Sequence, residues 1–422
     1  TGCERVAMSP KETKAPGAGL DEVFSAGAAR THQGARRPAV ASRMAKLTGL
    51  AVIAGAVGAA GLFPAAAVGI AATGVIHNEW ENQPNSVPAP SLPGRTKLLT
   101  VDGKKVAEVF STNRVPVSAD QQGPWIRKAV VAVEDARFYS HSGVDPIGTM
   151  RALVATGGGD SVQGGSTITQ QYAKNLRLTQ AAIEAGGEAT AETRDALTER
   201  SWKRKVAEAH LATVIEKSTS KEDILTGYLN VGYFGSGAYG IQAAARRYYS
   251  TDATKLTLSQ AATLAGVLQS PVSLDPRLNP ERTLVRRAQV LNAMAAQGMV
   301  TAAEAAQAQA EPITLALSLP EQGCQVAGRD WGMVCDGALR ELKAAAWLGP
   351  EATNLLRAGG LTVQLSVDPK TQKDVAAAAK DVIPADNRVA NAITLVEPGT
   401  GYVKGMASNR AFGEGKGATE IP

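Results

Sequence analysis

Between residues 124 and 310, apolar residues recur three and four positions apart, a spacing that predicts amphipathic α-helices. Two capping boxes mark helix starts, Thr257 with Gln260 and Thr301 with Glu304. Pro271 and Gly298 stand where helices should stop. This part of the chain is therefore predicted to be mostly α-helical.

Two flanking segments alternate apolar and polar residues, as β-strands do. The first, "KLLTVDGKKVAEVF", predicts a hairpin around Asp102 and Gly103, because Asp-Gly supplies the positive φ angles of a tight turn. After Gly359 and Gly360, "LTVQLSV" predicts a strand, "DPKTQKDVAAAAKDVI" a helix and "NAITLVEPGTGYVKGMAS" a hairpin turning at "PGTG". The second segment predicts the opening of an α/β domain.

The stretch from Leu47 to Ile76 has no charged residue and exceeds the ~20 residues that cross a hydrocarbon core. It predicts a transmembrane helix, with a buried soluble helix as the alternative. Five basic residues precede it: Arg30, Arg36, Arg37, Arg43 and Lys46. By the positive-inside rule we expect an uncleaved anchor with a cytoplasmic N-terminus and everything after His77 outside the cell.

The chain has 422 residues, of which 44% are hydrophobic and 20% charged, an ordinary globular composition with room for two folded modules. A net charge of +5 would also suit a nucleic-acid-binding protein. The basic residues next to the uncharged stretch favour a membrane instead, so no nucleic acid is expected as a partner.

Cys324 and Cys335 would lie in an oxidising compartment if the chain is anchored in this way. A structural disulfide closing a short loop is then expected. The zinc alternative is weaker, because no His or second Cys pair flanks them.

Glu134 occupies the apolar stripe of a predicted helix, four residues after Val130 and eight after Ile126. A carboxylate there is costly unless it is paired or useful. The spacing leaves two interpretations open: a general base, or a buried salt bridge to Arg137 or a distant Lys.

The segment "GGDSVQGGSTITQQYAKNL" places glycines before a group of hydroxyl and amide side chains, with Lys174 one turn later. A glycine loop at a helix start can present backbone N–H groups to a phosphate. A polar helix cap is the other interpretation, and the Walker pattern is absent.

Glu208 shares a helix face with Leu211 and Ile215 and follows Arg204 and Lys205. An ordinary ion pair between positions i and i+4 would explain it. As the second inward acid, it also suggests a carboxylate pair in which one group takes a proton while the other orients cations at a leaving group.

Five stretches occur in the order of the motifs of a known enzyme family: "EDARFYSHSGVD", "GGSTITQQYAKNL", "RKVAEAHLATVIE", "KEDILTGYLNVGYFGSGAYGIQAAARRYY" and "LTLSQAATLAGVLQSPVSLDP". In them, over roughly residues 95–310, the chain resembles the peptidoglycan glycosyltransferases (glycosyltransferase family 51), the N-terminal module of bifunctional class A penicillin-binding proteins. Residues 313–422 resemble the connecting segment and first strands of the transpeptidase domain. The long stretch between the second and third motifs is similar to that of actinobacterial-type members, while Tyr172 stands where Leu is usual.

The resemblance implies a mostly α, lysozyme-like glycosyltransferase domain, preceded by one transmembrane helix and followed by the start of an α/β transpeptidase domain. The expected division of the chain is a cytoplasmic disordered tail (1–46), the transmembrane helix (47–76), a Pro-rich extracytoplasmic spacer with short strands (77–122), the glycosyltransferase domain (123–312), a linker with the Cys pair (313–365) and the beginning of the transpeptidase domain (366–422). The chain contains no residue expected to be acylated by penicillin.

The implied activity is polymerisation of lipid II into β-1,4 glycan with release of undecaprenyl pyrophosphate, Glu134 removing the proton of the attacking 4-OH. Lys174, Arg204 and Lys205 would meet the pyrophosphate, while Glu208 either orders these cations or coordinates Mg²⁺ or Mn²⁺. No organic cofactor is implied. The other implied site residues are Ser166, Thr167 and Gln171 along the donor groove, and Asp135, Phe138 and His141 around the base.

Expected partners are lipid II, the growing glycan strand, the cell membrane, and proteins of the divisome or elongation complex. Two other functions compete with this one: a lysozyme-like lytic enzyme, and an inactive membrane scaffold for the cell-wall machinery. Paired acids alone do not separate building from cleaving. The basic cluster on the pyrophosphate side favours building.

Overall fold

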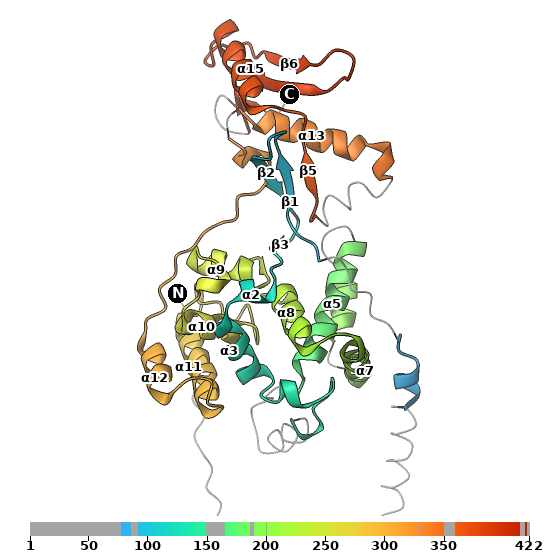
Figure 1. Cartoon of the computed structure of the whole chain (residues 1–422), viewed down its shortest axis with the longest axis vertical. Helices are drawn as coiled ribbons and strands as arrows, with labels where there is room; N and C mark the ends of the chain where they lie inside the picture. The colour runs from blue at the N-terminus through green and yellow to red at the C-terminus, as the bar shows by residue number, and fades with distance from the viewer. Residues whose placement is uncertain are drawn as a thin grey trace, which may run out of the picture. The chain divides into compact units, whose positions relative to one another are not determined.

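The computed structural model describes residues 77–85, 92–148, 165–185, 190–199, 201–328, 330–349, 359–413 and 418–419 (Figure 1). The predicted transmembrane helix at 47–76, the tail before it and Gly164 lie outside these ranges. Within them, the helices are all too short or too polar to cross a membrane.

The central part of the chain is helical, as the sequence predicts. Its helices are α2 (Ala119–Gln122), α3 (Pro124–Glu134), η1 (Phe138–Ser140), α5 (Ile168–Glu184), α6 (Ala191–Thr198), α7 (Trp202–Ser218), α8 (Lys221–Val231), α9 (Ile241–Tyr249), η2 (Ala253–Lys255), α10 (Leu258–Val267), α11 (Pro280–Ala296) and α12 (Ala302–Ala310). Both expected capping boxes are present at α10 and α12, and α11 ends just before Gly298 at φ +68°.

Two groups of helices share one hydrophobic core. In the first, α10 packs against α3 and α11; in the second, α5 packs against α7 and α8. Helix α10, "LSQAATLAGV", consists mainly of small and apolar residues and is buried between its neighbours along most of its length. Its small residues allow close approach: a Cβ at Gly266 would lie 2.9 Å from Cγ of Arg286 on α11. The arrangement holds the end of α3 against α11, where the site described below is formed.

The hairpin predicted at Asp102 and Gly103 is confirmed. Strands β1 (Thr96–Leu99) and β2 (Lys105–Val109) pair antiparallel across a turn in which Gly103 has φ +82°. The sequence did not predict that β1 also pairs in parallel with β5 (Thr362–Gln364), giving a sheet of order β2-β1-β5. Residues assigned to a spacer and to a linker thus belong to one sheet, because strand pairing across such a separation leaves no local pattern.

A second unpredicted pairing lies at the helical domain. Strand β3 (Asn113–Arg114) runs parallel to β4 (Ala238–Tyr239), with Arg114 opposite Tyr239. Each strand has only two residues, too few for an alternating pattern to show in the sequence.

The C-terminal part matches the predicted order of strand, helix and hairpin. Helix α15 (Pro369–Val382) is followed by the antiparallel pair β6 (Ala392–Val396) and β7 (Val403–Ser408), whose connection has Gly399 and Gly401 at positive φ. The remaining elements are η3 (Cys324–Val326), α13 (Gly332–Ala344), η4 (Ala346–Leu348), β8 (Ala411–Phe412) and β9 (Ala418–Thr419).

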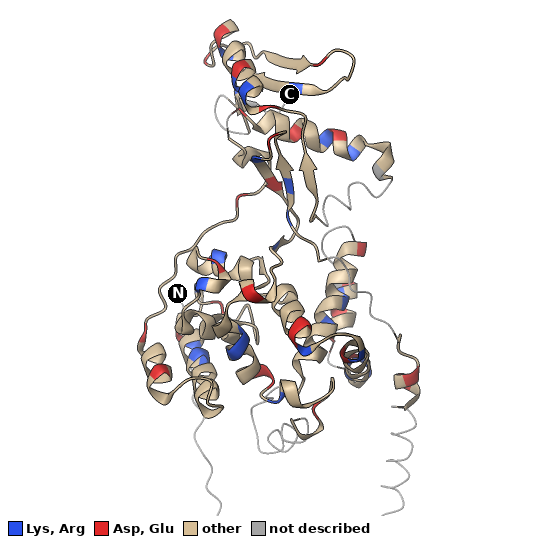
Figure 2. Cartoon of the chain, viewed as in Figure 1, with Lys and Arg blue, Asp and Glu red and all other residues tan. Residues whose placement is uncertain are grey.

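Cys324 and Cys335 form the disulfide expected from the sequence, with their Cα atoms 5.3 Å apart. It joins η3 to α13, and Cys335 packs in a small core with Leu98, Val106 and Ala107 of the first hairpin. Figure 2 shows acidic and basic residues close together along α13 and on the helical domain. In the described part of the chain, the positive charge is therefore spread rather than collected into one basic stretch.

Candidate active site

Glu134 is the last residue of α3, and its side chain is 12% exposed. The buried Ile126 and Val130 on the same stripe turn it inward, as the sequence predicts. Its Oε2 accepts a hydrogen bond from Gln171 Nε2 at 2.9 Å, and its Oε1 lies 3.6 Å from a guanidinium nitrogen of Arg286. Both oxygens of this carboxylate are therefore oriented by neighbouring side chains.

The cation beside Glu134 is not one that the sequence suggested. Arg137 forms an ion pair with Asp145 instead. Arg286 comes from α11, where it occupies the buried face that continues to Val290. A charged residue on an apolar stripe is the same signal that singled out Glu134, so the pattern in α11 could have identified Arg286 too.

Gln171 is itself held in place by Tyr228 of α8, whose hydroxyl donates to Gln171 Oε1 at 3.0 Å. Because the amide oxygen accepts from Tyr228, the amide nitrogen must face Glu134. Burial, and then the negative charge of Glu134, raise the pKa of Tyr228 well above its ordinary value, so the phenol remains a donor. No local pattern singles out Tyr228, since an aromatic residue in a helix usually packs in a core.

The loop after Glu134 is closed by Asp135. This carboxylate accepts from His141 Nε2 at 2.9 Å and from the backbone N–H of Ile168 at 3.1 Å, which ties the loop to the start of α5. Phe138 is fully buried beneath the ammonium group of Lys221, which lies 4.5 Å from the ring centroid. Asp135, Phe138 and His141 therefore shape this loop from within and do not face an open groove.

The start of α5 is a polar helix cap. Thr167 accepts from the backbone N–H of Gln170 at 3.1 Å, and Gln170 Oε1 accepts from the backbone N–H of Thr167 at 2.9 Å. The Thr167 hydroxyl donates to the carbonyl of Gly143 at 2.6 Å and is buried. Thr167 therefore caps a helix here, whereas the neighbouring Ser166 is partly exposed and bonds to Lys205.

The second carboxylate, Glu208, lies on α7 with only 4% of its side chain exposed. Its Oε1 accepts from Arg204 and its Oε2 from Lys205 Nζ at 3.0 Å. Lys205 Nζ also lies 2.6 Å from Ser166 Oγ. The ion-pair interpretation is confirmed, because Glu208 pairs with Arg204 and Lys205 on its own helix. That these two cations meet a leaving group stays a prediction.

Lys174, on α5, belongs to the same cluster. Burial lowers its pKa, and the charges of Lys205 and Arg204 act in the same direction, while Glu208 and Glu134 oppose the shift. A lysine that interacts electrostatically with two carboxylates and two cations is suited to binding an anion that carries more charge than a carboxylate does.

The sequence also allows Glu208 to be a metal ligand. Both of its oxygens are occupied by cationic side chains, and no group of three or more His, Cys, Asp or Glu residues in the described ranges could hold a metal ion. His210 instead packs edge-on against Trp80, with ring centroids 4.9 Å apart. The donor set fits the cation-ordering role of Glu208 and does not fit a protein-held divalent ion.

A helical domain with one oriented carboxylate and a second carboxylate set among cations has the parts needed for group transfer from an anionic donor. The comparison with known proteins gives the class. Residues 102–295 match the family model described as Transglycosylase. This region is a transglycosylase-family domain and is similar to the glycosyltransferase module of class A penicillin-binding proteins.

Three relatives illustrate the similarity. Penicillin-binding protein 2D of Bacillus subtilis (strain 168) is 32% identical over 333 residues, covering 77% of this chain and 44% of the relative. Penicillin-binding protein 1F of the same organism is 35% identical over 286 residues, covering 67% and 36%. Penicillin-binding protein 1A of Escherichia coli (strain K12) is 37% identical over 226 residues, covering 53% and 24%. The matches thus span less than half the length of these relatives.

Proposed function

We propose that the protein is a peptidoglycan glycosyltransferase that polymerises lipid II into β-1,4-linked glycan and releases undecaprenyl pyrophosphate. The observation that carries this proposal is that two carboxylates have different partners. Glu134 has its oxygens oriented by Gln171 and Arg286, whereas Glu208 holds Arg204 and Lys205. The first arrangement suits a proton acceptor and the second an anion-binding site.

In the proposed reaction, Glu134 takes the proton of the sugar 4-OH as that oxygen attacks C1 of the growing chain's reducing-end sugar. The bond from C1 to the pyrophosphate oxygen breaks, configuration at C1 inverts, and the bonding electrons leave with the pyrophosphate. Lys174, Arg204 and Lys205 stabilise the charge that develops there. Arg286 offsets the cost of holding the Glu134 charge in a part-buried position before the proton arrives.

We propose that the chain is a single-pass membrane protein, with residues 47–76 crossing the bilayer and the catalytic domain outside the cell. The basic residues before this stretch and the disulfide between Cys324 and Cys335 support that orientation. A polyisoprenoid substrate stays in the bilayer, so tethering would raise its effective concentration at the site. Proteins of the divisome or elongation complex are the proposed partners, and the long segment after residue 176 supports the actinobacterial type.

A lytic enzyme of lysozyme-like fold and an inactive scaffold are the alternatives. The cations around Glu208 argue against cleavage of an uncharged glycan, because its leaving sugar carries no pyrophosphate. The orientation of Glu134 by two side chains argues against a scaffold.

The test is polymerisation of labelled lipid II in detergent by the full chain and by Glu134→Gln, with muramidase digestion of the product. We expect digestible glycan from the wild type and a loss of ~10²-fold or more in the variant. Glu281→Gln, at an exposed acid in the first turn of α11, is the matched control and should be fully active. Degradation of added glycan would favour the lytic enzyme, and a folded wild-type chain without turnover would favour the scaffold.

A further inference from the structure

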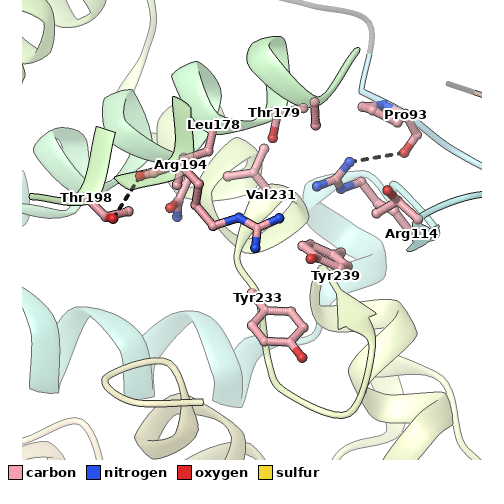
Figure 3. A pocket seen from close by; sticks show the side chains of 12 residues that line it. Pro93, Arg114, Leu178, Thr179, Arg194, Thr198, Val231, Tyr233 and Tyr239 are labelled. Atoms are coloured by element: carbon pink, nitrogen blue, oxygen red, sulfur yellow. Dashed lines mark hydrogen bonds between the residues drawn. The ribbon is translucent and has the colours of Figure 1, made fainter. Parts of the chain in front are cut away.

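A cavity of about 410 Å³ lies in the helical domain, next to the candidate active site but not part of it. It is lined by the second half of α5, by α6, by the end of α8 and by the β3–β4 pair (Figure 3). The lining residues used below are Arg114, Asn175, Thr179, Arg194, Tyr233 and Tyr239. Two of these are arginines, and none of the described residues that line the cavity is an Asp or a Glu.

Arg114 is the unusual member of the lining, because it is a buried cation without an acidic partner in the described part of the chain. It is 3% exposed, and no carboxylate of the described residues forms an ion pair with it. One guanidinium nitrogen donates to the carbonyl of Pro93 at 3.3 Å, while Nε is buried and unpaired. Burial lowers the pKa of Arg114 to about 10. A buried guanidinium without a counter-charge is costly, and an anion entering the cavity would offset that cost.

The fold holds Arg114 in this position. The parallel pairing of β3 with β4 sets it opposite Tyr239, and its guanidinium lies 5.3 Å from the centroid of that ring. The ring of Tyr239 is in turn 4.7 Å from that of Tyr233. The cation is therefore fixed before any ligand arrives, as an anion-binding site requires.

Arg194 supplies a second cation, from α6 on the exposed side of the cavity. In Figure 3, its guanidinium and that of Arg114 reach toward the middle of the pocket from different sides, with the rings of Tyr233 and Tyr239 close by. Planar guanidinium groups match carboxylates in two-pronged hydrogen bonds, and tyrosine rings pack against the apolar faces of sugars and peptides. Asn175 and Thr179 add hydrogen-bonding groups at the α5 wall.

The cavity and the active site share α5. Lys174 belongs to the active site, and the next residue, Asn175, lines the cavity. At 1.5 Å rise per residue, the cavity wall extends from Asn175 to Ala182, roughly 10 Å along the helix. A glycan substrate with its pyrophosphate at Lys174 could therefore place a neighbouring part of the same molecule here.

We propose that this cavity binds a carboxylate on the peptide arm of the glycan substrate and so helps to position the sugar units beside the reacting bond. The inference rests on the proposed function. In that function the pyrophosphate is met by Lys174, Arg204 and Lys205, so the remaining anionic groups of the substrate are the carboxylates of its peptide. The cavity is thus a substrate-binding site separate from the one that stabilises the leaving group.

The probe is the soluble disaccharide pentapeptide, which lacks the lipid and the pyrophosphate and so cannot be polymerised. Its binding to the full chain is measured by calorimetry and compared with that of the same molecule after its carboxylates are converted to primary amides. We expect the acid to bind about tenfold tighter or more, because a charge-assisted pair is lost in the amide. Arg194→Gln should remove this difference, while Lys373→Gln, at an exposed lysine of α15, should retain it.

Arg114→Gln should also remove the preference for the acid. If that variant does not fold, Arg114→Lys retains the charge but loses the two-pronged geometry, and a partial loss of preference is expected. Equal binding of acid and amide, or an unchanged preference in Arg194→Gln, would overturn the proposal. So would displacement of the probe from the cavity by inorganic phosphate at equal concentration, which would mark a phosphate site. If a variant loses binding of the probe but still polymerises lipid II normally, this inference is wrong and the proposed function stands. If the wild type binds the probe but does not polymerise lipid II, the proposed function is wrong.

Discussion

The position of Gly266 makes room for Arg286: a Cβ on Gly266 would lie 2.9 Å from Cγ of the arginine. The contact is on the stem of Arg286, close to its backbone, so the side chain cannot avoid it by moving its tip alone. Because the guanidinium of Arg286 lies 3.6 Å from Glu134, a glycine inside α10 helps to determine the geometry of the candidate base on α3.

Gly266→Ala should therefore lower polymerisation of lipid II by about tenfold, the order expected when an oriented catalytic group loses one of its contacts. The measure is kcat, with KM for lipid II little changed. Gly337→Ala in α13 is the matched control, because its Cβ would meet Met406 at an ordinary 3.4 Å. The control should gain up to about 1 kcal/mol in unfolding free energy and keep full activity. Equal activity of the two variants would show that Arg286 can move without consequence.

Tyr228→Phe removes the hydroxyl that fixes the Gln171 amide. We expect a loss in kcat of about tenfold, because Gln171 can then turn away from Glu134, together with a loss of about 1 kcal/mol in unfolding free energy. Tyr248→Phe is a suitable control, since the Tyr248 hydroxyl donates to the carbonyl of Phe234, at a distance of 3.0 Å, and not to a residue that contacts Glu134. The control should lose similar stability, measured by urea unfolding, without the loss in kcat. A similar loss of activity in both would reduce Tyr228 to a structural role.

Lys205→Gln tests the cation cluster with little risk to folding, because this side chain is 49% exposed. Its removal should change the unfolding free energy by less than about 1 kcal/mol. Turnover of lipid II should nevertheless fall by tenfold or more, because one of the charges proposed to meet the pyrophosphate is lost. Lys203→Gln, on the same helix and exposed, should be close to wild type. A Lys203 effect as large as that of Lys205 would mean that only the overall charge of α7 matters.

The pH dependence should show the lowered pKa of Lys174. A lysine with a depressed pKa loses its proton at a lower pH than the ordinary value of about 10.4, and the cluster then loses one positive charge. Activity should consequently decline on the alkaline side below that value. Lys174→Arg should move this decline to higher pH, since arginine remains charged. The kcat/KM profile of both proteins, recorded over the range in which they stay folded, checks this, and coincident profiles would rule Lys174 out as the titrating group.

Much of the helical architecture could be predicted from local patterns. The capping boxes at Thr257 and Thr301, the stop near Gly298 and the Asp102–Gly103 turn are all signals contained within a few residues. The parallel pairings β1–β5 and β3–β4 could not be predicted in this way, because their partners lie far apart in the chain and each strand is short.

The same limit applies to the site. The sequence identifies Glu134 and Glu208 because each is a charged residue on the apolar stripe of its own helix, which is unusual. Lys205 was found because it stands three residues before Glu208. The contacts of Tyr228 with Gln171, and of Arg286 with Glu134, join different helices, so only the packing of α8 and α11 against their neighbours reveals them.

The pairing of Leu98 with Val363 has a consequence for synthesis of the chain. Strand β1 can pair with β2 almost at once, but its other edge must wait for β5, about 265 residues later. At a ribosomal rate of 5–20 residues per second, that edge stays unpaired for roughly 13–50 s, while the whole helical domain is made. During this interval an exposed strand edge is open to pairing with other chains. The β1 segment is thus the place where a chaperone would have most to protect.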